Sequence, residues 1–377
     1  MIIGVDIRSM SGGAYTGVGE YTINVLKHMA ERATDAKFKL FFNAYNLEPG
    51  VEFSKDKIET HFFNYPNKYF SFKTRFFNRP KIDKMIGGAD VFFSPHFISA
   101  PVSRDCKRVV TFHDLSFERY PEFFDLRRKF WHFSNNPRAQ ARDADHIIAV
   151  SESTAYDLQD IYGIDKNKIS VVYSGVSEEF FKEISDEDLG IVRVRHNLPA
   201  RFILFISTIE PRKNVLGIIK AFEIFKESTG EDVSLVIAGK PGWLHKKVFR
   251  AMRDSKYNEN IKYIGFIKNS DKPALYRLSE VFVYPSIYEG FGFPPIEAMA
   301  SGVPVITSAR SSLPEVVEEA ALLVDPLNVS DIAWMMEELI GDKKLAQSLS
   351  IKGLAQARKF TWQKCAQETL DILQAIY

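Results

Sequence analysis

Two glutamates lie on either side of a turn that contains glycine. Glu289 and Glu297 have seven residues between them, and that interval holds Gly290, Gly292 and Pro294-Pro295. Glycines let the backbone approach an anion closely, and a helix that starts at the prolines presents unpaired N–H groups. The two carboxylates can accept hydrogen bonds from hydroxyls. The segment predicts a site for a ligand that carries both phosphate and sugar, with Glu297 in the first turn of the helix, although Glu297 alone could simply be a helix-start acid.

A pair of adjacent cations forms the second candidate site. Arg212 and Lys213 follow an expected strand, Phe202–Ser207, and precede an expected helix, Val215–Glu227. Arginine binds phosphate as a fork and lysine binds it as a point charge, so the pair can hold a diphosphate without a metal. Parallel sheets bind ligands at the carboxyl ends of their strands, which favours this interpretation over a solvated basic pair.

The first half of the chain offers two weaker candidates. His113 follows an expected strand, Arg108–Phe112, and could bind a hydroxyl or move a proton, or could be a structural histidine satisfied within the fold. The loop Gly12–Glu20, with Gly17 and Val18, lacks the last glycine of the dinucleotide-binding fingerprint. It can still aim backbone N–H groups at an anion.

Metal-binding patterns are weak. Asp143-Ala144-Asp145 resembles an Asp-x-Asp metal site, but it precedes the expected strand His146–Val150 and therefore lies at the wrong edge of the sheet for a ligand. We interpret it as a turn. The two cysteines, Cys106 and Cys365, form neither a disulfide framework nor a zinc set, which favours a reducing compartment.

Short apolar runs alternate with amphipathic segments twice along the chain, the pattern of parallel sheets covered by helices. Because 377 residues exceed the ~250–300 of a single core, we expect two α/β domains, 1–176 and 177–360, with a helix at 361–377 packing back on the first. The acidic stretch Glu178–Asp188 suits a linker. A further helix is expected over Asp331–Ile340, with Ser330 as N-cap and Gly341 past its end. The expected strands are Ile2–Ile7, Phe38–Phe42, Val91–Ser94, Arg108–Phe112, His146–Val150, Ile169–Tyr173, Phe202–Ser207, Ser234–Ala238, Lys262–Ile264, Val281–Tyr284 and Val303–Thr307.

Composition excludes several classes of protein. With 49 basic and 48 acidic residues, the net charge of +1 creates no global field that would gather nucleic acid. No apolar run reaches the ~18 residues of a membrane span, and Met1–Asp6 reads as a strand rather than a signal peptide. We expect a soluble cytoplasmic protein whose membrane contact, if any, is peripheral.

Two segments mix cations with aromatic residues, Lys68–Lys81 and Arg127–Phe133. Such mixtures suit the surface of an anionic membrane, where rings lie at headgroup depth and cations lie near phosphate. They equally suit helices whose rings face the core and whose cations face water. The segments match no nucleic-acid recognition motif.

Together these residues resemble the retaining glycosyltransferases of family 4 over nearly the whole chain. The most specific parts are Glu289-x7-Glu297 and Glu210-Pro211-Arg212-Lys213-Asn214, with Phe112-His113-Asp114 and Thr16-Gly17-Val18-Gly19 as weaker support. The resemblance implies the GT-B fold, in which two Rossmann-like, doubly wound parallel-sheet domains face one another across a cleft.

The resemblance also implies a donor site in the second domain. Glu297 would hold the ribose hydroxyls of a nucleotide-sugar, and Lys213 with Arg212 would hold its diphosphate. Glu289 and the backbone of Phe291-Gly292 would bind the sugar.

Other residues implied by the resemblance come from loops throughout the chain. His113 would lie beside the sugar, the Gly17 loop would meet phosphate or acceptor, and Phe266 with Ile267 would flank the base. Many family members have arginine where Ser207 stands, so we expect Arg212 to supply the missing charge. The expected catalytic residues are His113, Glu289, Lys213 and Arg212; the expected substrate-binding residues are Gly17, Val18, Asp114, Ser207, Gly239, Phe266, Ile267, Phe291, Gly292 and Glu297.

Within the family, the variant Thr208-Ile209-Glu210-Pro211-Arg212-Lys213-Asn214 is similar to bacterial mannosyltransferases that build O-antigen or capsule. This implies GDP-mannose as donor, a lipid-linked or oligosaccharide acceptor, and no metal or other cofactor. Nucleic acid is not expected as a partner, and the enzyme could work at the inner face of the plasma membrane. The alternatives are a UDP-sugar donor, a sugar-nucleotide epimerase, a glycoside hydrolase using Glu289 and Glu297, and a non-catalytic binding protein.

Overall fold

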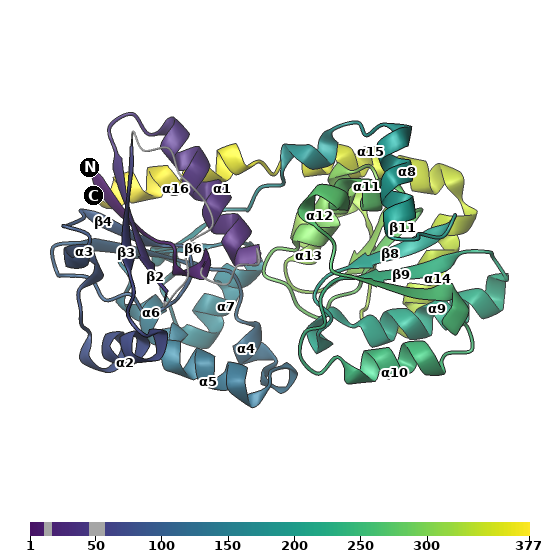
Figure 1. Cartoon of the computed structure of the whole chain (residues 1–377), viewed down its shortest axis with the longest axis horizontal. Helices are drawn as coiled ribbons and strands as arrows, with labels where there is room; N and C mark the ends of the chain where they lie inside the picture. Colours follow the sequence, from purple (N-terminus) through teal and green to yellow (C-terminus); the bar gives the residue numbers. More distant parts are fainter. Residues whose placement is uncertain (11–16, 45–56) are drawn as a thin grey trace. The chain divides into compact units, whose positions relative to one another are not determined.

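The computed structural model describes residues 1–10, 17–44 and 57–377. The chain divides into two compact units, one made of residues 1–175 with 361–377 and the other of residues 176–360. Each unit contains its own parallel sheet with helices around it, and both ends of the chain belong to the first unit (Figure 1).

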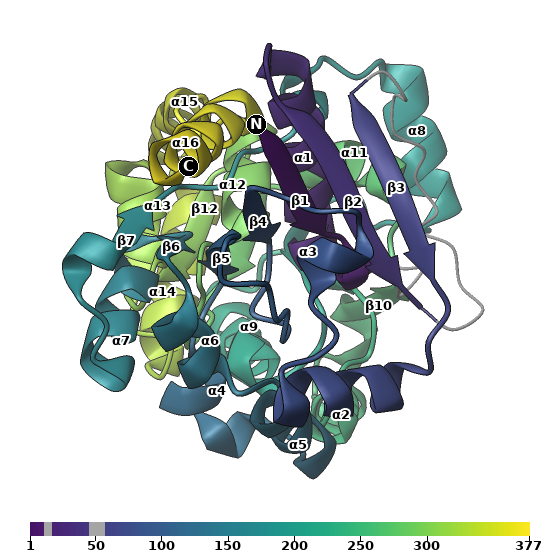
Figure 2. The same cartoon turned by 90° about the vertical axis from the view of Figure 1, so that its left-hand side faces the viewer.

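The first unit is built on a seven-stranded sheet with the order β3-β2-β1-β4-β5-β6-β7. Its paired strands run parallel, and β1 lies between β2 and β4, so the chain winds outward from the centre in both directions (Figure 2). The central strands are almost wholly buried because helices cover the sheet. The strands are β1 (Ile2–Asp6), β2 (Lys37–Asn43), β3 (Ile58–Phe63), β4 (Val91–Ser94), β5 (Lys107–Phe112), β6 (His146–Ala149) and β7 (Ile169–Val171).

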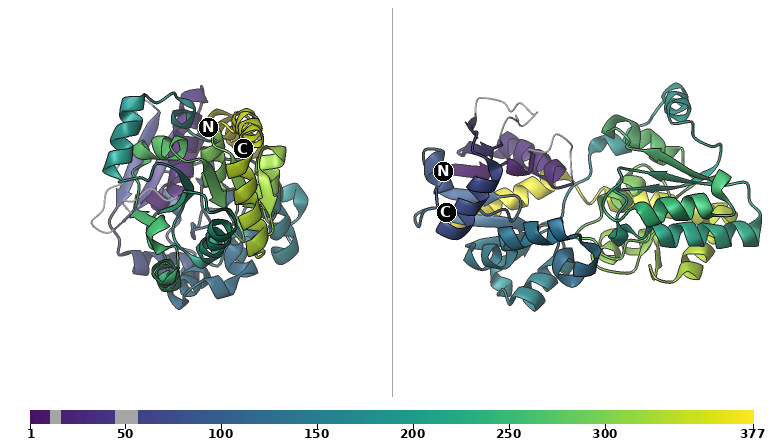
Figure 3. Two further views of the ribbon diagram at one scale, coloured as in Figure 1. Left: turned by 90° about the vertical axis from the view of Figure 1, so that its right-hand side faces the viewer. Right: turned by 60° about the horizontal axis from the view of Figure 1, so that its bottom comes forward.

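The last helix of the chain, α16, belongs to the first unit. Thr361 caps it by accepting a hydrogen bond from Lys364 N, and the helix packs against α1, as the yellow and purple helices of Figure 3 show. Gly175 makes room for this return, because a Cβ at that position would lie 2.1 Å from the backbone nitrogen of Trp362. The helices of the unit are α1 (Gly17–Arg32), α2 (Asn67–Phe77), α3 (Ile82–Met85), α4 (Ser116–Arg119), α5 (Leu126–Asn135), α6 (Pro137–Asp143), α7 (Glu152–Tyr162) and α16 (Trp362–Ile376).

The second unit has a six-stranded parallel sheet with the order β10-β9-β8-β11-β12-β13. Its two central strands, β8 and β11, pair directly with one another. The strands are β8 (Phe202–Ile206), β9 (Ser234–Ala238), β10 (Ile261–Gly265), β11 (Val281–Tyr284), β12 (Val305–Ser308) and β13 (Leu322–Val324), and the helices are α8 (Asp186–Arg195), α9 (Val215–Thr229), α10 (Lys246–Asp254), α11 (Lys272–Arg277), α12 (Phe293–Ala300), α13 (Leu313–Val317), α14 (Val329–Gly341) and α15 (Lys343–Ala357).

The structure corrects several expected element boundaries. Strands β3 and β13 were not predicted, and the expected linker contains the start of α8. Helix α14 is capped by Asn328, which accepts a hydrogen bond from Asp331 N, rather than by Ser330, and Gly341 is its last residue. Asp342 then caps the unpredicted α15.

The glycine loop of the first unit also differs from expectation. Gly17 and Val18 are the first residues of α1 and not part of a loop. The preceding glycines, Gly12 and Gly13, and Thr16 lie outside the described residues. Across the described ranges, no helix combines the length and the apolar composition that a membrane crossing requires.

Candidate active site

The loops that follow β8 and β11 form a polar cluster in the second unit. Because these two strands are parallel neighbours, their carboxyl ends bring the segments Ser207–Asn214 and Pro285–Gly292 to the same edge of the sheet. The first loop ends in a single 3-10 turn, Pro211–Lys213, and Asn214 then adopts a left-handed conformation (φ 56°) that redirects the chain into α9. The backbone N–H of Ile287 donates to the carbonyl of Arg212 at 2.8 Å and ties the two loops together.

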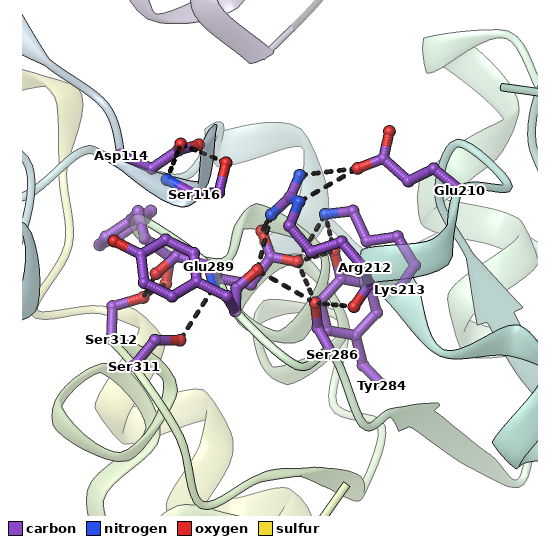
Figure 4. Close-up of polar contacts among 12 residues, drawn as sticks. Asp114, Ser116, Glu210, Arg212, Lys213, Tyr284, Ser286, Glu289, Ser311 and Ser312 are labelled. Atoms are coloured by element: carbon purple, nitrogen blue, oxygen red, sulfur yellow. Dashed lines mark hydrogen bonds and ion pairs between the residues drawn. The ribbon is translucent and has the colours of Figure 1, made fainter. Parts of the chain in front are cut away.

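Glu289 lies at the centre of this cluster (Figure 4). Its Oε1 accepts hydrogen bonds from Lys213 Nζ at 2.5 Å, Ser286 Oγ at 2.6 Å and Tyr284 Oη at 3.0 Å. Its Oε2 accepts from Arg212 Nη1 at 2.8 Å. The carboxylate is buried, and every one of these donors comes from the two loops or the end of β11. The site therefore contains a fixed carboxylate held by two cations.

Arg212 connects Glu289 to a second glutamate. Its Nε and Nη2 donate to Glu210 Oε1 at 3.1 and 2.9 Å, and its Nη1 also donates to the carbonyl of Tyr288 at 2.7 Å. Lys213 makes one further bond, to Tyr284 Oη at 2.6 Å. Both cations that we expected to bind a diphosphate are thus already paired within the second unit.

The electrostatics of the cluster favour an ionised Glu289. Burial by itself would raise the pKa of this carboxyl, but the charges of Arg212 and Lys213 together outweigh it and lower the pKa to about 2. Burial and the adjacent Arg212 charge lower the pKa of Lys213, while Glu289 opposes that change. Two cations and two carboxylates balance one another formally, so an arriving anion can bind only by sharing or replacing the glutamate contacts.

Glu297 belongs to a separate network. It lies in the second turn of α12, since the helix begins at Phe293 and carries no acid in its first turn, which corrects the expected position. Its carboxylate is buried and accepts from Tyr276 Oη at 2.8 Å and Lys272 Nζ at 3.2 Å, both on α11. The structure thus places the two predicted glutamates in different hydrogen-bond networks.

The turn before α12 is held in one conformation. Gly292 has φ 102°, and a Cβ there would lie 2.6 Å from Leu313 Cδ2, so only glycine fits without strain. Ser312 Oγ donates to the carbonyls of Glu289 and Phe291, each at 3.0 Å. The turn is therefore rigid, but the first turn of α12 offers fewer N–H groups than expected, because Pro294 and Pro295 carry none.

Four other predicted residues lie at the same edge of the second sheet. A Cβ at Gly239 (φ 132°) would lie 1.8 Å from the Ser207 carbonyl, so these residues touch at the ends of β8 and β9. Ser207 also hydrogen bonds through its side chain with Tyr284, which links it to the Glu289 cluster. After β10, Phe266 is 57% exposed with Lys240 Nζ 4.3 Å from its ring centroid, whereas Ile267 is buried. Phe266 offers an open ring for stacking, and Ile267 does not.

His113 lies at the carboxyl end of β5 in the first unit. Its Nε2 is 2.7 Å from the carbonyl of Pro95, and because a carbonyl only accepts, Nε2 carries the proton. Burial lowers the pKa of His113, so the ring is neutral near pH 7 and Nδ1 is a hydrogen-bond acceptor. The next residue, Asp114, accepts from the N–H and hydroxyl of Ser116 at 2.9 and 2.6 Å and so supports the start of α4. His113 can serve a ligand, while Asp114 holds the local backbone.

Comparison with known proteins identifies the family. Residues 15–180 match the model "Glycosyltransferase Family 4", and residues 191–356 match the model "Glycosyl transferases group 1". The two matches together span most of the chain. The chain belongs to glycosyltransferase family 4.

The relatives of this glycosyltransferase match most or nearly all of its length. The chain is 27% identical to the O-antigen chain mannosyltransferase B of Escherichia coli, over 94% of this chain and 95% of the relative. It is 32% identical to the serotype-specific mannosyltransferase WbdA of Escherichia coli over 74% of this chain, and that match spans about a third (35%) of WbdA. The Anabaena protein Alr3699/HepE, solved in complex with UDP-glucose, superposes with a TM-score of 0.75 at 17% identity, over 99% of each chain. This likeness confirms the predicted GT-B fold.

Sequence reasoning missed several polar residues that lie beside the predicted ones within each unit. Glu210 and Tyr284 complete the polar network around Arg212 and Lys213. His96 follows β4 as His113 follows β5, and the two ring centroids are 5.8 Å apart. Its Nδ1 is buried without a hydrogen-bond partner, and burial keeps its pKa well below the usual value. The signal that could have found His96 is its place directly after a predicted strand that neighbours the His113 strand.

The Asp-x-Asp segment joins the end of α6 to the start of β6 and is not a separate turn, although it lies at the amino end of the strand as the sequence predicts. Asp145 accepts a hydrogen bond from Arg108 N at 2.9 Å at the amino end of the sheet, and Asp143 is the last residue of α6. Within the described residues of the glycosyltransferase, no group of three or more histidine, cysteine, aspartate or glutamate side chains is arranged to hold a metal ion.

Proposed function

We propose that this glycosyltransferase moves mannose from GDP-mannose to a lipid-linked or oligosaccharide acceptor in the synthesis of a bacterial surface polysaccharide, with retention of the anomeric configuration. The observation that carries the proposal is the buried cluster of Arg212, Lys213 and Glu289 at the carboxyl ends of β8 and β11. The choice of mannose and of this acceptor class is supported by the names of the O-antigen mannosyltransferases that the chain resembles.

The cluster suits the departure of a diphosphate. When the donor binds, its phosphate oxygens take over part of the hydrogen bonding that Arg212 and Lys213 now give to Glu289. The two cations and the N–H groups before α12 then stabilise the charge that grows on the phosphate as the sugar–oxygen bond breaks. Released from part of its pairing, Glu289 accepts hydrogen bonds from hydroxyls of the sugar.

The remaining contacts of the donor involve a buried carboxylate and an exposed aromatic ring. Glu297 holds the ribose hydroxyls by exchanging its bond with Lys272, and Phe266 stacks on the base. The N-terminal N–H groups of α1, at Gly17 and Val18, face phosphate or acceptor.

His113 acts from the first unit. Its unprotonated Nδ1 accepts a hydrogen bond from a sugar hydroxyl. The acceptor hydroxyl attacks the anomeric carbon on the face that the diphosphate leaves, and its proton passes to the departing phosphate oxygen. In this proposal Arg212 and Lys213 stabilise the negative charge of the leaving diphosphate, so neither a metal ion nor another cofactor takes part.

A UDP-sugar donor is the second candidate. It is favoured by one observation, the UDP-glucose complex of the structurally similar Anabaena protein. An exposed phenylalanine stacks on uracil as readily as on guanine, since both have a π-face.

Transfer assays with a donor panel test the proposal. Purified protein is incubated with GDP-mannose, GDP, UDP-glucose and UDP-galactose, each with and without a lipid-linked oligosaccharide from a mannose-rich surface polysaccharide. We expect release of GDP from GDP-mannose only when the acceptor is present, together with a product that carries one more mannose. Consumption of a UDP-sugar instead would show that the donor is not GDP-mannose. Hydrolysis of the acceptor without any nucleotide would refute the proposal that the protein is a transferase.

We further propose that the reaction takes place at the inner face of the plasma membrane, where a lipid-linked acceptor is held.

A further inference from the structure

Two neighbouring helices of the first unit expose their aromatic rings. Helices α2 and α5 lie in contact with one another, as Figure 2 also shows. In α2 only Phe70 and Thr74 are buried, and in α5 only Asn135 is buried. The rings that a globular protein would hide are exposed instead, by between half and seven-tenths: Phe72 53%, Phe76 62%, Phe77 64%, Phe130 70% and Phe133 70%.

The exposed rings gather on these helices rather than being scattered. The ring of Phe72 lies 5.0 Å from that of Phe76 and 5.9 Å from that of Phe77, measured between centroids. Leu126, at the start of α5, is 85% exposed. Exposed aromatic residues that gather in this way mark interaction sites in proteins.

The same helices carry an excess of positive charge. The segment 67–81, which consists of α2 and the four residues after it, contains five cations and no acid. In α5, the first residue is followed by Arg127, Arg128 and Lys129. The acid that precedes them, Asp125, is engaged in capping α5 and in an ion pair with Arg128. We call the exposed residues of α2 and α5 the aromatic-basic face.

We propose that the aromatic-basic face binds an anionic lipid bilayer. An anionic bilayer can bind both kinds of side chain on this face: the phenylalanine rings lie at headgroup depth and the cations contact lipid phosphate. A second copy of the chain, docked face to face about a two-fold axis, would bring like charges together, because α2 has no acid to pair with them. Nucleic acid would neutralise the cations but would leave Leu126 and the outermost rings in water.

Membrane binding of this kind would serve the proposed function, because a lipid-linked acceptor is confined to the bilayer surface. Only the biological purpose of the binding rests on the proposed function. The face would then hold the first unit at the surface where that acceptor is found. The binding itself requires neither donor nor acceptor.

Flotation with vesicles tests the inference. Purified full-length protein without nucleotide-sugar is mixed with vesicles of phosphatidylglycerol and phosphatidylcholine, or of phosphatidylcholine alone, and floated through a density gradient. We expect co-flotation with the anionic vesicles only, and its loss as salt is raised. Absence of co-flotation with the anionic vesicles would overturn the proposal, and so would equal binding to both kinds of vesicle.

Two sets of variants separate the rings from the charges. The variant F72S/F76S/F130S removes rings, and K68Q/K73Q/K129Q removes charges; each should lower the bound fraction at least about tenfold. The matched controls lie on the second unit: V194S/L327S/I351S changes equally exposed apolar residues, and K246Q/K247Q/R250Q changes exposed cations of α10. Controls that lose binding as strongly as the two test variants would contradict the assignment to this face.

Activity and sedimentation distinguish the remaining outcomes. The test variants should keep transfer to a water-soluble acceptor and lose transfer to a vesicle-embedded one. Wild-type protein that floats but transfers no sugar would support membrane binding by the aromatic-basic face and refute the proposed function. If the wild type forms dimers and does not float, and the variant F72S/F76S/F130S is monomeric, the face binds a second copy of the chain and the bilayer proposal is overturned.

Discussion

The residues after β8 and β11 show how a chain can hold two cationic side chains in place at a proposed diphosphate site. Arg212 and Lys213 are held within hydrogen-bond distance of Glu289, so their positions are fixed before any ligand arrives. Fixed charges need no reorganisation when negative charge develops, which makes them more effective than mobile side chains. The cost is that Glu289 must be ionised in the folded state.

Acid should destabilise the protein through Glu289. Its pKa is 4.5 in the unfolded chain and about 2 in the fold, so its contribution is complete above pH 4.5 and is lost as the pH falls toward 2. The difference corresponds to on the order of 3 kcal/mol. Urea unfolding of the wild type and of Glu289→Gln, followed from about pH 5 to pH 3, should show a smaller loss of unfolding free energy in the variant. Parallel curves would mean that Glu289 does not titrate in this way.

Substitutions of His113 should reveal which ring nitrogen serves the substrate. Asparagine places an acceptor near the position of Nδ1, whereas glutamine reaches toward Nε2 and the Pro95 carbonyl. We expect His113→Asn to retain most of kcat/KM and His113→Gln to lose about tenfold, roughly 1.4 kcal/mol. Steady-state kinetics with saturating acceptor measure the ratio, and a glutamine variant more active than the asparagine variant would assign the contact to Nε2.

Sequence and structure agree on these residues only in part. Position after a predicted strand was enough to place Arg212, Lys213 and Glu289 at one edge of the sheet, because parallel strands bring their carboxyl ends together. It could not show that Glu289 pairs with both cations, since that depends on the direct pairing of β8 with β11. Nor could it show that Glu297 is engaged by α11, an element without a strong sequence pattern.

At the scale of elements, short turns at the strand ends set the geometry. The turn before α12 depends on Gly292, which combines a left-handed backbone with close contact to Leu313. The central strands β1, β4, β8 and β11 were predictable because they are buried apolar runs. The edge strand β3 is half exposed and β13 has only three residues, so neither produces such a run.

Replacing Gly292 by alanine should be far more harmful than replacing Gly302. Both residues have positive φ, 102° and 76°, but a Cβ at Gly302 would meet nothing closer than 3.7 Å. Strain alone costs on the order of 1 kcal/mol, and the clash with Leu313 adds to it. Thermal unfolding should therefore show a lower Tm for Gly292→Ala than for Gly302→Ala, and the former should also lose donor binding. Equal Tm values would show that the turn adapts.

At the scale of the whole molecule, the chain leaves the first unit at residue 175 and returns to it at residue 361. The returning helix α16 buries Trp362, Leu370 and Leu373 against the first unit. The first unit is therefore completed only by the last residues described.

Truncation after residue 360 should unfold the first unit and leave the second folded. Burial of each large apolar side chain contributes about 1.5–3 kcal/mol, so losing three of them removes an amount comparable to the stability of a domain. Limited proteolysis of the 1–360 fragment should digest residues 1–175 and leave a resistant fragment near 176–360. Protection of both parts equal to that of the full chain would mean that α16 contributes little.

The most direct test of the central claim is sugar transfer in the presence of a metal chelator. Wild-type protein, Lys213→Ala and the exposed control Lys247→Ala are incubated with GDP-mannose, acceptor and EDTA, and thermal unfolding is recorded to confirm that each variant is folded. If fixed cations stabilise the leaving diphosphate, the wild type and the control keep full activity while Lys213→Ala loses more than about tenfold in turnover, at least about 1.4 kcal/mol. A wild type that is inert until manganese is restored, or a Lys213→Ala variant with unchanged turnover, would contradict the account.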